Sequence, residues 1–378
     1  MTTRESAGAI VTVDLDAVAG NWRHLKARLA PGADCGAVVE ADAYGLGARR
    51  IAPALAAAGC RHFFVVAIDE GIDLAPAVPG ADVAVLAPLV AGNEATIAAH
   101  GLIPTLNTLA DVEAWSAFAR RKGDVLPALL HVDTGMRRLG LAPDEVARLV
   151  AEPERLDGVA VRLLMSHLAC ADEAHHPLND KQLAGFIAAK TRLASAGIAP
   201  AASLANSAGI FLGPEYHFDL ARPGAALYGI APVPGEPNPM TPAVRVQAKI
   251  LQVRDVDAPE TVGYGATHRV SRPGRIATVA SGYADGYPRS LSNIGTGFIG
   301  EHRVPVVGRV SMDLTTIDVT GVPENLARPG ALVDLIGPLN PVDDVAQAAG
   351  TIGYELLTRI GRRAHRVWQG GNGDETPA

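Results

Sequence analysis

The sequence predicts an α/β fold in which an N-terminal (β/α)8 TIM-like barrel is followed by a C-terminal, mainly antiparallel β domain. Between about residues 35 and 225, eight short apolar runs alternate with amphipathic stretches. Five prolines then fall within residues 231–242, and the rest of the chain holds short Val- and Ile-rich runs separated by Gly and Pro. Apolar runs of this length are typical of parallel strands buried on both faces, and eight of them with helices between favour a closed barrel. An open, doubly wound sheet is the alternative.

The eight apolar runs are the predicted barrel strands: Gly36–Val39, His62–Ala67, Val83–Ala87, Leu102–Leu106, Ala128–Val132, Val159–Met165, Ala201–Ala205 and Phe218–Ala221. The stretches between them predict the covering helices: Gly47–Ala58, Asp69–Ala75, Asn93–Ala99, Leu109–Arg121, Pro143–Val150, Lys181–Ala196 and Ser207–Leu212. A further strand at Ile10–Asp14 precedes a helix at Leu15–Leu29, so this strand is a candidate for the other domain.

The proline-rich segment predicts the interdomain linker. We therefore assign residues 10–235 to the barrel and residues 240–372 to the β domain, with residues 8–14 as a candidate additional strand of the latter. The runs that predict its strands are Val244–Val256, Ile276–Ala280, Val304–Val310, Thr315–Val319 and Leu332–Ile336.

The composition argues against several classes of function. Hydrophobic residues make up 48% of the 378 residues and charged residues only 19%, so the chain can bury a large core. The net charge of -7 and the lack of a basic run argue against nucleic-acid binding. Residues 1–8 do not resemble a signal peptide, and no apolar run reaches the roughly 18 residues of a membrane span. The three cysteines, Cys35, Cys60 and Cys170, lack a metal-ligand spacing. We expect a cytoplasmic protein without a metal, membrane or nucleic-acid partner.

Polar residues directly follow several of the predicted barrel strands. They are Glu40–Tyr44, Asp133–Arg138, Ser166–His167, Asn206–Ser207 and Arg222. The carboxyl ends of barrel strands form one rim, where this fold carries its catalytic residues. The sequence therefore predicts a site at this rim.

These residues belong to a series of motifs that resembles the alanine racemases, which are fold-type III enzymes of bacterial cell-wall metabolism that use pyridoxal 5'-phosphate (PLP). The resemblance runs almost end to end. Its motifs are, in order, Glu40–Gly45 (EADAYG), His131–Gly140 (HVDTGMRRLG), Ser166–His167, Ala205–Ala208, Ala221–Gly224, Val262–Thr267, Ser281–Tyr287, Gly308–Asp313 and Gly353–Glu355.

The resemblance implies PLP as the cofactor and L-alanine and D-alanine as the interconverted pair. Two bases are implied, one for each face of the reacting carbon. One is the lysine that holds PLP, and the other is Tyr264, reaching in from a partner subunit. Because a phenol has a pKa of about 10, Tyr264 needs help from neighbours, and the resemblance places His167 and Arg222 nearby. Arg222 is further implied to face the pyridine nitrogen, where a guanidinium can only donate.

The resemblance also implies the binding residues. Those implied for the cofactor are Tyr44, Arg138, Asn206, Ser207, Arg222, Gly224 and Tyr354. Those implied for the substrate are Arg138, with Met312 and Asp313 from the partner subunit. Because Tyr264 and Met312 act from a second chain, the resemblance implies a homodimer with shared sites.

The sequence departs from the family pattern at two positions. Glu40 stands where the family has its PLP lysine, and a carboxylate cannot form that covalent link. The five lysines of the chain, Lys26, Lys122, Lys181, Lys190 and Lys249, all fall outside the predicted rim. We therefore expect PLP to bind non-covalently, or already joined to an amino acid, with racemase activity impaired. His131 stands where many family members have a carbamylated lysine, so Arg138 is expected to be held differently, with Asp133 as a candidate.

Two explanations of Glu40 fit the sequence: an engineered lysine-to-glutamate change in a racemase, or a natural paralogue with another role. The alternative functions are a catalytically inert PLP- or amino-acid-binding protein and a racemase for another small amino acid. A PLP decarboxylase fits the β-domain motifs less well.

Overall fold

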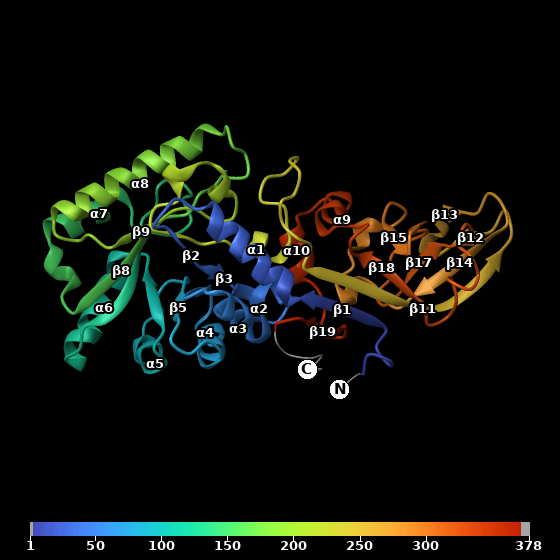
Figure 1. Ribbon diagram of the computed structural model, residues 1–378, viewed down its shortest axis with the longest axis horizontal. Helices are drawn as coiled ribbons and strands as arrows, with labels where there is room; N and C mark the ends of the chain where they lie inside the picture. The colour runs from blue at the N-terminus through green and yellow to red at the C-terminus, as the bar shows by residue number, and fades with distance from the viewer. Residues whose placement is uncertain (1–2, 372–378) are drawn as a thin grey trace.

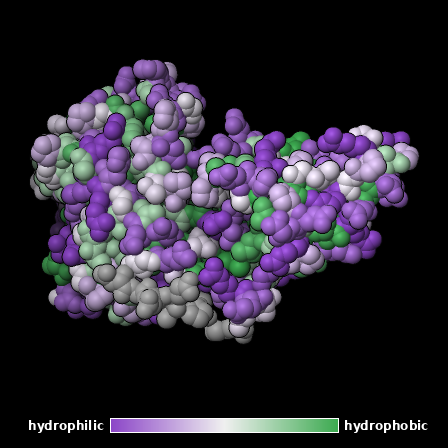
Figure 2. All heavy atoms as spheres, turned by 45° about the vertical axis from the view of Figure 1, so that its right-hand side comes forward, coloured by the Kyte–Doolittle hydropathy of each residue, from purple (hydrophilic) through white to green (hydrophobic). Residues whose placement is uncertain are grey.

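The computed structural model describes residues 3–371, which form an elongated molecule with a barrel at one end and a β domain at the other (Figure 1). Helix α1 (Leu15–Arg28) lies between the two parts. No helix within residues 3–371 combines the length and apolar composition needed to cross a bilayer. Figure 2 shows hydrophilic and hydrophobic atoms intermixed over the visible face of both parts.

Seven parallel strands in chain order make up most of the barrel. They are β3 (Ala37–Val38), β4 (His62–Val65), β5 (Asp82–Val85), β6 (Ile103–Leu106), β7 (Leu126–His131), β8 (Val159–Met165) and β9 (Ala201–Ser203). Strand β10 (Leu220–Ala221) pairs with β2 (Asp34–Cys35), which directly precedes β3. The N–H of Arg222 also donates to the carbonyl of Ala205 at 2.8 Å, beyond the end of β9. These bonds close the sheet, so the barrel prediction is confirmed and the open sheet is excluded.

The strands are short and buried, and helices cover them on the outside. The helices are α3 (Ala48–Ala58), α4 (Ile68–Leu74), α5 (Glu94–Ala99), α6 (Leu109–Lys122), α7 (Pro143–Ala151) and α8 (Pro177–Ser195). Sequence signals explain where several of them begin. Thr108 and Asp111 form a reciprocal capping box at the start of α6, and the Asp14 carboxylate accepts from the N–H of Ala17 at the start of α1.

The long strand β11 (Val244–Val256) organises the β domain. It pairs antiparallel with β1 (Ala9–Asp14), β14 (Gly274–Val279) and β18 (Leu332–Ile336). The strands β15 (Thr296–Ile299), β16 (His302–Pro305) and β17 (Thr315–Asp318) extend this sheet antiparallel, whereas β19 (His365–Gln369) pairs parallel with β1. Smaller elements complete the domain: β12 (Thr261–Val262), β13 (His268–Arg269), α9 (Val342–Ala349) and α10 (Gly353–Thr358).

The structure shortens one predicted strand of the β domain. The run Val304–Val310 is extended only as far as Pro305, the end of β16. Gly308 follows with φ of +78°, and a Cβ at this position would lie 2.8 Å from the carbonyl oxygen of Val262. The chain therefore turns where hydropathy alone predicts a continuous strand.

Candidate active site

The carboxyl ends of the barrel strands gather two groups of predicted site residues. We call residues 131–138, 166–167, 203–207 and 222–224, which end or follow β7 to β10, the late rim. We call Glu40–Gly45, which follow β3 and form the element α2, the early rim. Tyr354 on α10 joins the early rim, because its ring lies 6.3 Å from that of Tyr44 between centroids.

Arg222 is the buried cation of the late rim, with 3% of its surface exposed. Its guanidinium donates to the hydroxyl of Ser203 and, at 2.5 Å, to the carbonyl of Ser166. Burial lowers the pKa of Arg222 to about 10, so the group is still protonated at neutral pH. These bonds fix the guanidinium against the ends of β8 and β9.

Ser207 connects two loops of the late rim. Its hydroxyl oxygen accepts from the N–H groups of Gly224 at 3.0 Å and Ala226 at 3.3 Å. The hydroxyl proton is not used in these bonds and can be donated to a ligand. The helix predicted after Ser207 is only a four-residue 3-10 turn, Ala208–Phe211, whose loop is closed by a bond from the N–H of Gly209 to the Asn206 side chain at 2.9 Å.

Gly224 brings the late rim against the early rim. A Cβ at this position would collide with the hydroxyl of Tyr44 and lie 3.3 Å from the Cβ of Val38. Among residues 3–371, no group lies within hydrogen-bond distance of the Tyr44 hydroxyl. The Tyr44 ring is held instead by the ring of Tyr228, 4.8 Å away, and the hydroxyl of Tyr228 donates to the carbonyl of Val38 at 2.9 Å. The rim therefore offers an unused phenol and an unused serine proton close to Gly224.

Two histidines of the late rim are kept neutral. Burial, and then the charge of Arg222, lower the pKa of His131 to about 4 and that of His167 to about 3. Nδ1 of His131 lies 2.7 Å from the Asn107 side-chain oxygen, which positions the ring. Asn107 directly follows strand β6, and the rule that found the other rim residues would have found it too.

The early rim has an unusual backbone. Ala41, Asp42, Ala43 and Tyr44 all have φ between 53° and 57°, so α2 is a left-handed turn. For non-glycine residues this conformation costs roughly 1–2 kcal/mol each, and it persists only where the surroundings enforce it. The β domain supplies that support: Nε of Arg366 donates to the carbonyl of Gly45 at 3.1 Å, and the Trp368 indole donates to that of Leu46 at 2.8 Å.

Glu40 begins this turn and is partly buried. Burial, and then the nearby carboxylate of Glu70, raise its pKa, while Arg138 opposes them. Within residues 3–371, no donor lies within hydrogen-bond distance of the Glu40 carboxylate. Glu70, by contrast, accepts from the N–H groups of Val66 and Ala67 at 3.0 Å each. Sequence analysis gave no signal for Glu70, which acts here only because the fold places it beside Glu40.

No lysine lies at the rim in the described part of the chain. Lys26 on α1 bonds Asp34 at 2.7 Å, Lys122 pairs with Asp124, and Lys249 on β11 bonds the carbonyl of Arg4. Lys181 and Lys190 both belong to α8. The predicted absence of a substitute lysine is consistent with these positions.

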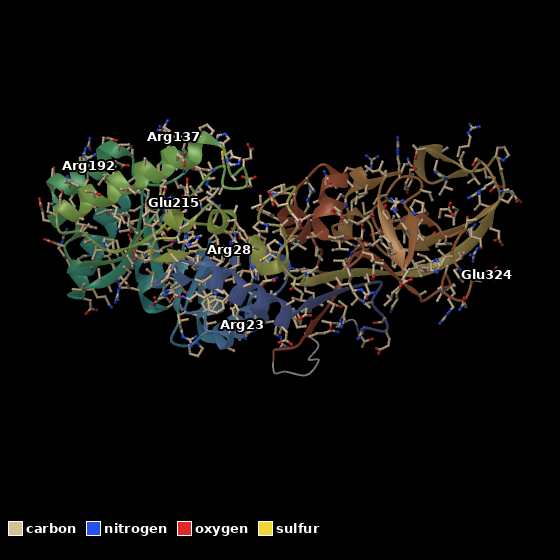
Figure 3. All side chains as sticks on the ribbon, turned by 45° about the horizontal axis from the view of Figure 1, so that its top comes forward. Arg23, Arg28, Arg137, Arg192, Glu215 and Glu324 are labelled. Carbon is tan, nitrogen blue, oxygen red and sulfur yellow. The ribbon has the colours of Figure 1, made fainter. Side chains whose placement is uncertain are left out.

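The Asp133 carboxylate does not hold Arg138. It accepts from the N–H groups of Gly135 at 2.9 Å and Arg137 at 3.1 Å, and so shapes the loop after β7. Arg137 points outward into solvent (Figure 3). Arg138 is exposed, and no carboxylate between residues 3 and 371 lies within ion-pair distance of it. Its guanidinium is therefore available to an anionic ligand.

Three predicted residues belong to the β domain. Tyr264 falls between β12 and β13, which Figure 1 shows at the end of the molecule remote from the barrel. Tyr264 is 72% exposed and Met312 is 54% exposed. Asp313 accepts from Nη1 of Arg363 at 2.7 Å. One chain therefore does not bring Tyr264 to its own barrel.

The sequence matches two domain families over nearly its whole length. The alanine racemase N-terminal domain matches residues 13–232, and the alanine racemase C-terminal domain matches residues 243–368. The chain belongs to the alanine racemase family. It is 53% identical to an alanine racemase of Rhodospirillum rubrum over 371 residues, with 98% of each chain covered. It is 48% identical to a catabolic alanine racemase of Mesorhizobium japonicum, covering 97% of this chain and 94% of that one.

Solved structures of the family share the fold. The alanine racemase of Bartonella henselae, with covalently bound pyridoxal phosphate, superposes with a TM-score of 0.91 at 41% identity, covering 96% of this chain and all of the other. That of Bacillus anthracis, with bound L-Ala-P, gives 0.87 at 30% identity, covering 98% and 96%. The predicted family and fold are thereby confirmed, whereas the individual site residues stay predictions.

Proposed function

We propose that this chain binds PLP and alanine at the barrel rim, in a racemase site whose turnover is suppressed by Glu40. The observation that carries the proposal is the contrast within the rim. The rim carries groups suited to a phosphate and a carboxylate, among them the Ser207 hydroxyl proton, the Tyr44 hydroxyl and the guanidinium of Arg138, but the position of the covalent anchor holds a carboxylate.

The residues present fit the phosphate and ring of PLP. The hydroxyls of Ser207, Tyr44 and Tyr354 form a neutral donor set of the kind that holds phosphate groups, and the lack of a side chain at Gly224 lets the Tyr44 hydroxyl approach the loop of Ser207. Asn206 fixes the loop that carries Ser207. Arg222, held by Ser203 and Ser166, would donate to the pyridine nitrogen, and Arg138 would bind the phenolic oxygen and the substrate carboxylate.

When bound, PLP supplies an electron sink that acidifies the Cα–H bond of an amino acid joined to it. In this proposal Tyr264 holds or receives the proton on one face of that carbon. His167, neutral beside Arg222, is the group that assists the phenol. On the other face the chain has Glu40, which cannot anchor the cofactor or exchange it for substrate. Removing a positioned base typically costs about 10² to 10⁴ in rate.

The test compares L-to-D alanine interconversion by the native chain, Glu40→Lys and Glu40→Gln, each with PLP in excess. We expect Glu40→Lys to be faster than the native chain by at least about 10²-fold and Glu40→Gln to stay near background. Equal rates for the native chain and Glu40→Lys would refute the suppressive role of Glu40.

A second candidate, a catalytically inert PLP- or amino-acid-binding protein, is favoured by Glu40 itself. It predicts that all three proteins bind PLP and that none, including Glu40→Lys, interconverts alanine. Rapid racemisation of another small amino acid by Glu40→Lys, with alanine left unchanged, would instead change the assigned substrate.

The position of Tyr264 at the end of the molecule remote from its own rim, together with the exposure of Tyr264 and Met312, supports a homodimer in which each chain completes the site of the other. A mixed dimer tests this arrangement. The native chain lacks the lysine, and the double variant Glu40→Lys/Tyr264→Ala lacks the phenol, so each is inactive alone. Co-expression should restore activity if Tyr264 acts across the dimer, because one site of the mixed dimer then holds both groups. Continued inactivity, with mixed dimers demonstrated, would contradict shared sites.

A further inference from the structure

The rim fits a phosphorylated pyridine ring but offers nothing that reacts with an aldehyde. The carboxylate of Glu40 stands at the end of β3, where the reactive carbon of PLP would have to be anchored. Its chemistry is that of an acceptor only, as long as it is ionised. A ligand that matches this rim must therefore bring donors to Glu40.

The described residues around Glu40 do not supply hydrogen-bond donors to its carboxylate. The neighbouring Glu70 is already supplied by the backbone N–H groups of Val66 and Ala67, and its other oxygen lies 3.4 Å from the N–H of Asp42. Arg138 favours the charged form of Glu40 but is not within bonding distance of it. Two carboxylates thus face one region with a single, unpaired guanidinium nearby. A partly buried charge without a partner is costly, so a ligand cation at this point would be strongly favoured.

We propose that this rim prefers pyridoxamine 5'-phosphate, the aminated form of the cofactor, over PLP, with the Glu40 carboxylate accepting hydrogen bonds from the ligand's ammonium group. The inference rests on the proposed function only in using the same phosphate and ring contacts. The two ligands share those contacts and differ at the 4-position. There the aldehyde of PLP has only an acceptor oxygen, whereas the amine brings a positive charge and three donors.

The reach of the side chain is compatible with this contact. Glutamate is one atom shorter than lysine, so its carboxylate oxygen stands about where the last carbon of the lysine chain would be. A charge-assisted N–H···O bond spans about 2.8 Å, against about 1.45 Å for the C–N bond it replaces. A change of side-chain rotamer can take up a difference of this size. The ammonium nitrogen can then lie close to the place of the missing lysine nitrogen.

The experiment measures dissociation constants by quenching of intrinsic tryptophan fluorescence, checked by calorimetry. The ligands are pyridoxamine 5'-phosphate, PLP and pyridoxine 5'-phosphate, and the last is a matched control because it carries a neutral hydroxyl where pyridoxamine 5'-phosphate carries the ammonium. The proteins are the native chain, Glu40→Gln and Ser207→Ala. Glu40→Gln keeps the shape and removes the charge, and Ser207→Ala weakens the phosphate contact shared by all three ligands.

We expect the native chain to bind pyridoxamine 5'-phosphate at least about tenfold more tightly than either other ligand, as one charge-assisted hydrogen bond predicts. Glu40→Gln should abolish that preference, and Ser207→Ala should weaken all three ligands while keeping it. Equal affinities in the native chain, or a preference that survives Glu40→Gln, would overturn the inference. Because the racemase test uses Glu40→Lys and alanine, either proposal can fail while the other stands.

Discussion

The late and early rims of the barrel contribute to one site, but the buried side chains of the late rim are held from within the rim and the early rim is held by the β domain. In the late rim the buried groups are held by others: Arg222 by Ser203 and Ser166, and Ser207 by two backbone N–H groups. In the early rim the backbone is left-handed over four residues and the carboxylate of Glu40 has no donor in the described chain. The early rim is supported from outside, by Arg366 and Trp368 of the β domain.

This difference explains how one position can change its chemistry while the fold persists. A substitution of Arg222 or Ser207 breaks bonds within the late rim, so the site and the local packing fail together. Glu40 takes part in no such bond, and the turn that carries it is held through carbonyls of its neighbours. The residue that decides covalent chemistry is therefore also a residue that the fold does not constrain.

The largest expected effect is a loss of stability at acidic pH, because the folded protein keeps His131 and His167 neutral. Their folded pKa values, about 4 and about 3, lie below the unfolded value of about 6.5, so below pH 6.5 the unfolded chain binds protons that the folded chain does not. Stability should therefore fall as the pH drops from 7 to 5, by about 2 kcal/mol for each histidine. Urea unfolding at the two pH values measures this.

The variants His131→Asn and His167→Asn should each reduce that loss of stability by about 2 kcal/mol. Between pH 7 and 8 the free energy of unfolding should change with pH to the same extent in all three proteins. A native protein that is equally stable at pH 5 and pH 7 would show that the late rim does not hold its histidines neutral.

The next largest expected effect is the loss of stability caused by a substitution at Gly224, where the two rims are in contact. Gly224→Ala should destabilise the protein by about 1–3 kcal/mol, because the added methyl group meets the hydroxyl of Tyr44 and the Cβ of Val38. Adding Tyr44→Phe should recover part of the loss by removing the hydroxyl. Thermal unfolding of both single variants and the double variant forms a cycle. Simple additivity of the two changes would mean that the rims are not in contact here.

The smallest expected effect is the gain in stability when a strained residue of the early rim is replaced by glycine. Ala41→Gly should raise the free energy of unfolding by roughly 1 kcal/mol, since glycine adopts φ of +53° without steric cost. The matched control is Ala57→Gly in the ordinary helix α3, which should lower it by roughly 1 kcal/mol. Denaturant unfolding measures both, and two changes of the same sign would contradict the left-handed turn.

The sequence predicted the strands well because burial on both faces leaves a direct mark. Val159–Met165, Val244–Val256 and Leu332–Ile336 coincide with β8, β11 and β18, and the strand predicted at Ile10–Asp14 is β1 with one residue added at its start. The left-handed turn of Ala41–Tyr44 was missed, because of these residues only Asp42 is of a type that favours positive φ, and as a single residue and not as a run of four. Strand β19 was also missed, since its hydropathy shows no clear alternation.

The sequence by itself determined the order of strands and helices, the rim positions of the polar residues, and the glutamate where the family has a lysine. The first two follow from periodicity and residue type, which are local properties, and the third follows from the resemblance of residues 40–45 to the family motif. Only the tertiary structure decided that Glu40 faces Glu70, that Arg222 spends its donors on Ser203 and Ser166, and that β19 supports the early rim across more than 300 residues. Such contacts depend on which surfaces the closed barrel and the β domain bring together, and no local preference of the chain encodes them.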